Sequence, residues 1–300
     1  MGPVCGDGVI QFDTEDCDGP DLGGATCDSV LGGAYEGTLG CDACQFDTNL
    51  CKRRSGMREG PVMATVPRTN GSGTFQIDST EVTRAQYEYF LQHVPSGFGL
   101  PPFCNFQGAT VSDFTPDPAC LASAPLDGAG PGARNRSPIV CVDFCDALAF
   151  CQWAGKSLCG GTTMFPPNAP WDMLGDSNVN AWTAACTANG SATYPYGSTY
   201  QVGTCNDDGI GLQEVGTRGS CHSPKAGYDM LRDMSGNVSE WNDACQGGMG
   251  ANDLCAVRGG DFAAAPDALK CASSDFRPRA TQEGSLGFRC CEVTGMPPPL

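Results

Sequence analysis

The chain has 300 residues, enough for one large domain or two smaller ones, and its 34 acidic and 17 basic residues give a formal net charge of −17. This charge argues against a nucleic-acid binder, which needs a basic face, and against electrostatic docking on anionic lipid. No apolar run reaches the roughly 18–20 residues that cross a bilayer, so membrane insertion is not expected.

The cysteines indicate the redox environment. The sequence has 20 cysteines but only two histidines, His93 and His222, and a single CxxC motif, Cys41–Cys44, whereas zinc sites usually need two such half-motifs. An even number of cysteines spread over the whole chain favours disulfides formed outside the cytosol. We therefore expect an extracytoplasmic protein, secreted or on the cell surface, from which an export signal has been removed. Cys41 and Cys44 could form a redox pair, but their Gly- and Asp-rich surroundings favour structural bridges.

Residues 1–51 are predicted to form a small cysteine-rich module stapled by disulfides. They carry six cysteines and ten acidic residues without a lysine or arginine, and they are rich in turn residues. Such a stretch cannot bury much core, so bridges must hold it together. An acidic cluster within the module could bind calcium, although a solvated acidic face is favoured. The cluster consists of Asp13, Glu15, Asp16, Asp18 and Asp21.

The motifs of this module resemble the cysteine-rich repeats of myxobacterial surface and secreted proteins. They are CGDGVIQ at residues 5–11, EDCDG at 15–19 and DLGGATC at 21–27. Residues 52–56 follow as a short basic linker, and 57–295 are expected to form the main domain.

Two helices and a strand are predicted near the start of the main domain. The strand covers residues 75–79 and leads to Thr83, which can cap a helix with Gln86 completing a capping box. A second helix is predicted over 143–154, where apolar residues recur at helical spacing and Gly155 provides the stop.

The remaining chain carries little periodic sequence. Residues 95–137 and 197–227 are rich in Gly, Pro and Ser, which favours a domain braced by disulfides and metal over a helix bundle or a Rossmann sheet. The Pro-rich residues 296–300 are expected to form a loose tail.

Seven motifs of residues 57–295 resemble, in order, those of the formylglycine-generating enzyme or sulfatase-modifying factor family. They are DSTEVT at 78–83, PIV at 138–140, DFCDALAFCQWAGK at 143–156, YPYG at 194–197, SGNVSEW at 235–241, RGG at 258–260 and LGFRC at 286–290. The resemblance implies an α+β domain of the C-type-lectin-like kind with little regular secondary structure.

The resemblance also implies two disulfides. One joins Cys151 to Cys290, and the other joins Cys186 to Cys271. The ten other cysteines of the domain have no such guide, and vicinal Cys290 and Cys291 are expected to serve two separate bridges. Two further pairings are guesses: Cys245 with Cys255, and Cys159 with Cys205.

A structural calcium site is expected around residues 233–240. By resemblance its ligands are the side chains of Asp233 and Glu240 and the carbonyls of Gly236 and Val238, and Ca²⁺ prefers six to eight such oxygens. The alternative is a turn whose Asp and Glu accept hydrogen bonds from backbone amides. A second calcium site would begin at Asn206, with Asp207 or Asp208 as a partner.

The residues that carry the family's chemistry are missing. The enzymes oxidise a substrate cysteine to formylglycine with two cysteines, five residues apart, that bind Cu(I), a soft ion that prefers thiolates. Here Ala264 occupies the first thiol position, Asp261 replaces the motif serine, Ser239 replaces an expected tryptophan, and no cysteine occurs between residues 256 and 270. No copper site is therefore expected.

Three functions remain open on the sequence. The favoured one is a non-catalytic binding or structural module for a protein, peptide or glycan. The second is a copper-dependent oxidase of the formylglycine-generating type that acts on a protein cysteine with relocated thiols. The third is another enzyme that uses acidic residues near 207–240, which would need a cleft with a carboxyl group of raised pKa. A Ser–His–Asp site on His93 or His222 is less expected than surface or capping roles for these residues.

Overall fold

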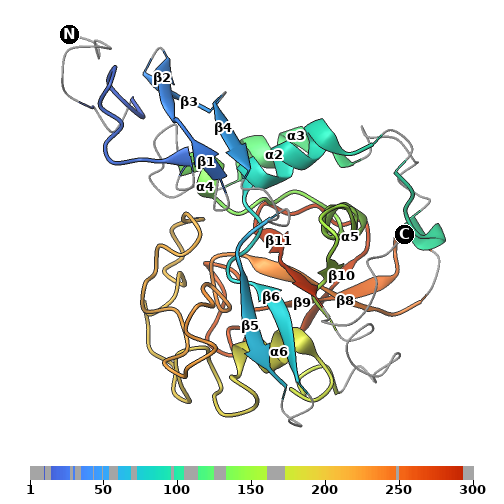
Figure 1. Cartoon of the computed structure of the whole chain (residues 1–300). Coiled ribbons are helices and arrows are strands. Elements are labelled where there is room, and N and C mark those ends of the chain that lie inside the picture. The colour runs from blue at the N-terminus through green and yellow to red at the C-terminus, as the bar shows by residue number, and fades with distance from the viewer. Residues whose placement is uncertain are drawn as a thin grey trace.

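The computed structural model has an α+β architecture of short elements joined by long irregular segments (Figure 1). It describes residues 10, 15–27, 30, 35–42, 44–48, 50–53, 60–68, 73–95, 98–104, 114–124, 133–160, 173–247 and 250–292. Within these ranges no helix has the length and apolar character that a bilayer span requires. The predicted tail at 296–300 lies outside the described residues.

Four short strands form the N-terminal module, at the upper end of Figure 1. Strand β1 (Tyr35–Gly37) pairs with β4 (Cys51–Arg53), and β2 (Gly40–Asp42) pairs with β3 (Gln45–Asp47). Disulfides Cys17–Cys41 and Cys27–Cys51 staple the module, which confirms that bridges hold it. Because Cys41 is bonded to Cys17, it does not form a redox pair with Cys44, which is itself disulfide-bonded.

The predicted linker at 52–56 begins too early. Lys52 and Arg53 belong to β4, because β1 offers an antiparallel partner for their backbone groups. The predicted solvated acidic face is also wrong in part. Glu15 and Asp18 are buried, whereas Asp21 is exposed, and Asp13 lies outside the described residues.

Two four-stranded sheets form the main domain. The first has the order β5 (Met63–Pro67), β6 (Thr74–Asp78), β12 (Cys290–Glu292) and β7 (Ser157–Leu158), all antiparallel. The second has the order β10 (Asp275–Pro278), β9 (Leu254–Arg258), β8 (Ser239–Cys245) and β11 (Leu286–Phe288), with β11 parallel to β8. The last strand, β12, therefore closes the domain by inserting between two strands from its first half.

The helices are short, and both predicted helices are confirmed. Helix α2 (Arg84–His93) has Thr83 as its N-cap with the full capping box to Gln86, and α5 (Phe144–Trp153) is capped by Asp143. Further helices are α3 (Pro118–Ser123), α4 (Ala133–Arg136), α6 (Ala181–Cys186) and a 3₁₀ helix at Pro102–Cys104.

Aromatic side chains join α2, α5 and β11 into one core. The ring of Tyr87 stacks on Phe150 with centroids 5.8 Å apart, and it meets Phe90 and Phe288 edge-on. All four side chains are fully buried. Burial of apolar surface on this scale stabilises the fold by about 25 cal/mol for each Å² removed from water.

The structure contains both disulfides that the resemblance implies. Cys151–Cys290 joins α5 to β12, and Cys186–Cys271 joins α6 to the segment before β10. The guess Cys245–Cys255 is also present, because these residues face one another on β8 and β9. The remaining bonds are Cys104–Cys145, Cys120–Cys141, Cys159–Cys291 and Cys205–Cys221.

The guess that Cys159 pairs with Cys205 is wrong. Strand β7 lies beside β12, which brings Cys159 next to Cys291, and Cys205 instead closes a loop with Cys221. Vicinal Cys290 and Cys291 thus serve two separate bridges, as expected.

A buried ion pair fixes the same region. Lys156, which follows α5, places its Nζ 2.5 Å from Asp78 Oδ1 at the end of β6, and both side chains are inaccessible to solvent. The second oxygen of Asp78 accepts the Cys290 amide at 2.9 Å. One carboxylate therefore holds α5, β6 and β12 together.

Replacing Asp78 with Asn should be strongly destabilising, because Lys156 would remain buried without a counter-charge. We expect a loss of about 3–5 kcal/mol in the free energy of unfolding, measured by chemical denaturation. Asp267→Asn, which breaks the exposed pair with Lys270, is the matched control and should cause no measurable change. Equal stability of the two variants would contradict the role given to the buried pair.

Candidate functional site

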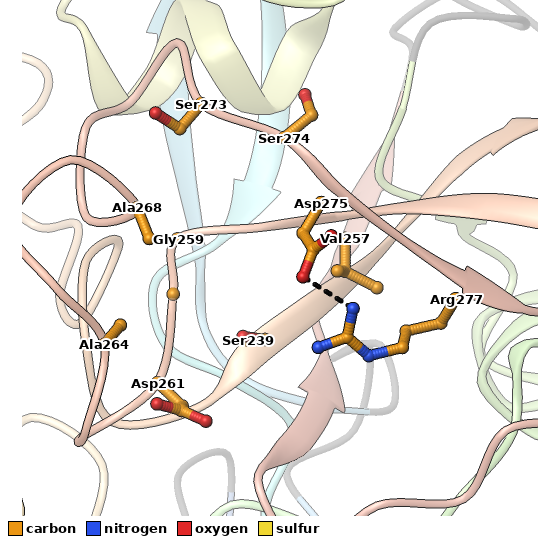
Figure 2. Close-up of a pocket in the computed structure, with 11 residues that line it drawn as sticks. Ser239, Val257, Gly259, Asp261, Ala264, Ala268, Ser273, Ser274, Asp275 and Arg277 are labelled. Atoms are coloured by element: carbon orange, nitrogen blue, oxygen red, sulfur yellow. Dashed lines mark hydrogen bonds and ion pairs between the residues drawn. The ribbon is translucent and has the colours of Figure 1, made fainter.

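A pocket of about 400 Å³ opens beside Ala264 (Figure 2). It lies where β8 begins, β9 ends and β10 begins. Its lining residues are Ser239, Val257, Gly259, Gly260, Asp261, Ala264, Ala268, Ser273, Ser274, Asp275 and Arg277. Most of these side chains are small, and the charged ones lie on two sides of the opening.

The turn after β9 shapes this pocket. Gly259 and Gly260 have φ values of +85° and +66°, a left-handed backbone that favours glycine. A Cβ on Gly260 would lie 2.9 Å from Ala264 Cβ and 3.2 Å from Leu269 Cδ2. The loop therefore folds back so that positions 264 and 269 both flank Gly260.

Both positions carry hydrocarbon side chains. Ala264 and Leu269 are five residues apart, the spacing of the copper-binding cysteines in the enzymes that the sequence resembles. None of the cysteines in the described part of the chain is free. No described thiol can therefore replace them, which removes the basis for relocated copper ligands among these residues.

The carboxylates of the pocket are unequally neutralised. Asp275 forms an ion pair with Arg277 at 2.5 Å, and Arg277 also contacts Glu283 at 3.1 Å. Partial burial acts to raise the pKa of Asp275, but the hydrogen bonds from Arg277 and the Phe276 amide and the positive charge of Arg277 together outweigh it and hold the pKa below its usual value. Asp261 accepts the Ala263 amide at 3.0 Å and has no ion-pair partner among the described residues.

A buried arginine supports the pocket from behind. Arg258 stacks over Trp182, with its guanidinium carbon 5.3 Å from the ring centroid, and donates to Thr183 Oγ1, Ser274 Oγ and the Cys271 carbonyl. Burial lowers the pKa of Arg258 to about 9. Because side chains alternate along a strand, Arg258 points to the face of β9 opposite Val257, which lines the pocket.

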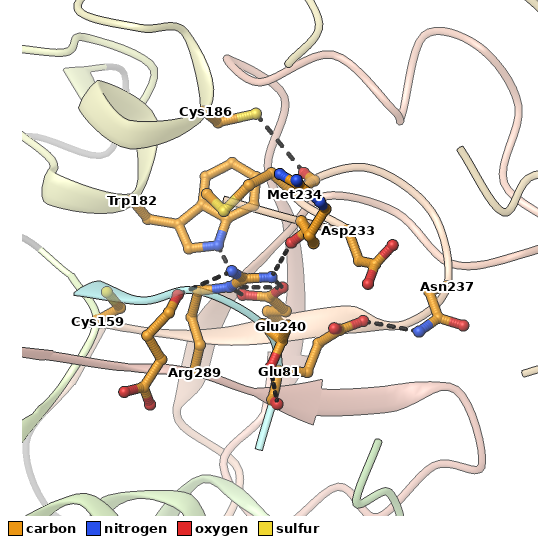
Figure 3. Close-up of polar contacts among 12 residues, drawn as sticks. Glu81, Cys159, Trp182, Cys186, Asp233, Met234, Asn237, Glu240 and Arg289 are labelled. Carbon is orange, nitrogen blue, oxygen red and sulfur yellow. Dashed lines mark hydrogen bonds and ion pairs between the residues drawn. The ribbon is translucent and has the colours of Figure 1, made fainter. Parts of the chain in front are cut away.

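The residues expected to bind calcium lie deeper in the domain (Figure 3). Asp233 has a φ of +54° and accepts the Gly216 amide on Oδ2 at 2.5 Å. Burial raises the pKa of Asp233 to about 6. The expected ligand Glu240 is fully engaged elsewhere, because its two oxygens accept bonds from Arg289 and from Trp182 Nε1.

The turn between these carboxylates is tightly built. Gly236 has a φ of +75°, and a Cβ there would lie 2.2 Å from the Asn206 carbonyl oxygen. This contact brings Asn206 against the 233–240 turn, whereas sequence reasoning assigned Asn206 to a separate site. Asp207 and Asp208 do not join it there, since Asp207 accepts the Tyr200 hydroxyl at 2.7 Å and Asp208 pairs with Arg218.

Sequence reasoning missed Glu81 as a site residue. It lies in the first family-like motif and is completely buried. Burial, reinforced by the nearby Asp233 carboxylate, raises the pKa of Glu81 well above its usual value. In the sequence, the indication was a charged residue beside the apolar Val82. A match to a family motif does not by itself show what such a residue does. Neither Glu81 nor Asp233 lines the pocket beside Ala264.

The remaining candidates form no catalytic arrangement. The His93 ring stacks on Tyr89 and bonds the Tyr89 carbonyl, and His222 bonds the Ser223 carbonyl. In the N-terminal module, ligand atoms of Glu15, Asp18 and Cys44 lie close together, but Cys44 is disulfide-bonded and offers no thiolate to a metal.

Comparison with known proteins supplies the family context. The profile of a family described as sulfatase-modifying factor enzyme 1-like domain matches residues 45–293. A Bos taurus protein named inactive C-alpha-formylglycine-generating enzyme 2 is 28% identical over 196 residues, which cover 57% of this chain and 56% of the relative. The Mus musculus protein of that name is 27% identical over 195 residues, covering 56% and 54%. The chain thus spans about half the length of these curated relatives.

Solved structures are similar at lower identity. PvdO from Pseudomonas aeruginosa is 17% identical, with 79% of this chain and 92% of that chain covered and a TM-score of 0.47. The structure of CarF is 18% identical, with 73% and 86% covered and a TM-score of 0.46.

Restoring two sulfurs beside Gly260 should create a copper site. In the double variant Ala264→Cys/Leu269→Cys, two thiolates would flank the same glycine, an arrangement suited to a soft monovalent ion. We expect the double variant to take up one Cu(I) per chain in competition with a chromogenic chelator, whereas the native protein takes up none. Stoichiometric Cu(I) binding by the native protein would show that its sulfurs are arranged differently.

Proposed function

Because the chain belongs to the sulfatase-modifying factor enzyme 1-like family, we propose that it is a non-catalytic binding module on that scaffold, with the pocket beside Ala264 as its binding site. The observation that carries this proposal is the pair Ala264 and Leu269 at the positions of the copper ligands. Hydrocarbon side chains can neither ligate copper nor transfer electrons. The mammalian relatives are named inactive, which agrees with this reading.

The proposed ligand is a basic side chain, lysine or arginine, of a partner protein or peptide. Asp261 offers a carboxylate at the opening that no described cation neutralises, and charge-assisted hydrogen bonds are among the strongest that a site can form. Arg277, the cation in the lining, is already held by two carboxylates. The net charge of −17 would attract a cationic partner to the protein as a whole.

The size and polarity of the pocket suit the same ligand. About 400 Å³ accommodates a long side chain, and the small residues of the lining leave that volume open. Ser239 and Ser273 add hydroxyl groups along the wall. Irregular loops carried on a rigid frame are the usual place for recognition sites.

The proposed setting is extracytoplasmic. Nine disulfides join described cysteines, and such bonds form and persist in oxidising environments. A secreted or surface-bound protein is the arrangement that we propose on this basis.

The test uses four short peptides that differ at one residue, Ac-Gly-X-Gly-NH₂ with X as Lys, Arg, Glu or norleucine. We expect the Lys and Arg peptides to shift the amide resonances of Gly259, Gly260 and Asp261, and the norleucine and Glu peptides to leave them unchanged. Asp261→Asn keeps an acceptor for the Ala263 amide but removes the charge. It should weaken binding about tenfold, the typical value of a charge-assisted bond.

The matched control is Asp229→Asn. Asp229 is an exposed residue that also accepts a backbone amide two positions away, from Gly227, but it does not line the pocket. This control should bind like the native protein. Preference for the Glu peptide, or equal binding by Asp261→Asn and the native protein, would reject the proposed ligand.

A further inference from the structure

Three tyrosines lie close together in the irregular segment between α6 and β8 (Figure 1). The rings of Tyr194 and Tyr196 stack almost parallel, at 9°, with their centroids 5.6 Å apart. The ring of Tyr200 is tilted against Tyr194, with a centroid distance of 5.8 Å. Tyr194 is buried, whereas Tyr196 and Tyr200 are half-buried. The two outer rings therefore rest on a buried aromatic base and keep part of their surface open to solvent.

A carboxylate lies beside these rings. Asp207 accepts the Tyr200 hydroxyl at 2.7 Å and the Gly203 amide at 3.0 Å. The hydrogen bond from Tyr200 to Asp207, together with burial and the charge of the carboxylate, raises the pKa of Tyr200 to about 12. Burial raises the pKa of Tyr196 against the opposing hydrogen bond from the Gln201 amide, and the charge of Asp207 adds to the rise. Asp207 is therefore close enough to influence both outer rings.

No cation of the described residues forms an ion pair with Asp207. The basic side chains of two neighbouring segments are each held by another carboxylate. Arg218 pairs with Asp208, and Lys270 Nζ lies 2.6 Å from Asp267 Oδ1. Asp207 is half-buried, so it has lost part of its hydration and would gain from a charged hydrogen-bond donor. An unneutralised negative charge thus lies beside aromatic rings.

Cross-links hold this arrangement in place before any ligand binds. The disulfide Cys205–Cys221 closes the loop that contains the carboxylate. The Tyr194 hydroxyl donates to the Pro266 carbonyl at 3.1 Å and so ties the aromatic base to the loop that carries Ala264. A site that is already ordered loses little conformational entropy when it binds a ligand.

Aromatic rings beside a carboxylate are suited to an organic cation. The face of an aromatic ring attracts a cation within about 6 Å of its centroid. A guanidinium is flat and weakly hydrated, stacks on such a ring, and presents paired N–H donors that match a carboxylate. An ammonium has no flat face to stack, and the charge of Asp207 would repel an anion. Arginine therefore fits this arrangement better than lysine or an acidic ligand.

We propose that Tyr196, Tyr200 and Asp207 form a surface site for an arginine side chain of a partner polypeptide. The guanidinium donates to Asp207, and its plane packs against the accessible surface of the two rings. None of these three residues lines the pocket beside Ala264, so the site does not depend on the ligand proposed for that pocket.

The test is a nuclear magnetic resonance titration of the full, disulfide-bonded protein with Ac-Gly-X-Gly-NH₂, where X is arginine, lysine or citrulline. Citrulline keeps the flat end of arginine but has no charge. The reporters are the amides of Gln201 and Gly203, which donate to the Tyr196 hydroxyl oxygen and to Asp207. We expect saturable shifts with the arginine peptide, binding several-fold weaker with the lysine peptide, and no shift with the citrulline peptide.

Variants separate the charge from the rings. Asp207→Asn should weaken binding of the arginine peptide about tenfold, the typical value of a charge-assisted bond. Asp229→Asn makes the same change at another carboxylate that accepts a backbone amide, and should bind like the native protein. Tyr196→Leu should weaken binding about threefold, whereas its matched control Tyr196→Phe keeps the ring and should bind within a small factor of the native protein.

Equal affinity for the arginine and citrulline peptides would overturn the proposal. So would equal movement of the Gly227 amide, which donates to Asp229 and reports non-specific attraction to the acidic surface. If Asp207→Asn disturbs its loop, the two Tyr196 variants still decide, since equal binding by both rejects the role of the ring.

Failure of this site is distinguishable from failure of the pocket. The amides of Gly259 and Gly260 report the pocket, and Asp261→Asn should leave the shifts of Gln201 and Gly203 unchanged. Loss of those shifts in Asp261→Asn would show that the peptide binds at one place only, in the pocket, and would reject the second site.

Discussion

The rest of the domain depends on the contacts that the Arg289 side chain makes. Arg289 lies between β11 and β12 in the chain, and its fully buried guanidinium forms paired bonds to Glu240 on β8. It also donates to the Asp78 carbonyl on β6 and to the Arg232 carbonyl. A buried charge without partners would cost several kcal/mol, so these bonds fix the two sheets relative to each other. Glu240 is thus paired with Arg289, whereas Glu81 and Asp233 form no ion pair among the described residues.

Different interactions determine the frame of the domain and the shape of its pocket. The frame is set by buried cations, Arg289 and Arg258, and by disulfides that join α5 to β12 and α6 to the segment before β10. The pocket is set by a glycine turn after β9 and by small side chains around it. The loop can therefore exchange sulfur for hydrocarbon at positions 264 and 269 without disturbing the frame. Loss of the reaction and retention of the fold are compatible for this reason.

The sequence was informative where the determining interactions are local. The capping box of Thr83 and the stop after α5 depend on residues within one turn, and both are confirmed. Partners set by tertiary pairing were not accessible in the same way. Cys159 meets Cys291 only because β7 lies beside β12, and no spacing encodes that register. The position of Glu81 likewise depends on a contact with Asn237, 156 residues away.

The central claim is that this chain has kept the scaffold of its family and has lost the ability to oxidise a substrate cysteine. The most direct measurement is to incubate the protein with Cu(I), oxygen and a cysteine-containing peptide, and to follow the peptide by mass spectrometry and by hydrazide capture of aldehydes. The account predicts that the cysteine is unchanged except for ordinary disulfide formation, which occurs equally without the protein. Conversion of the cysteine to an aldehyde in amounts that exceed the protein added would contradict it.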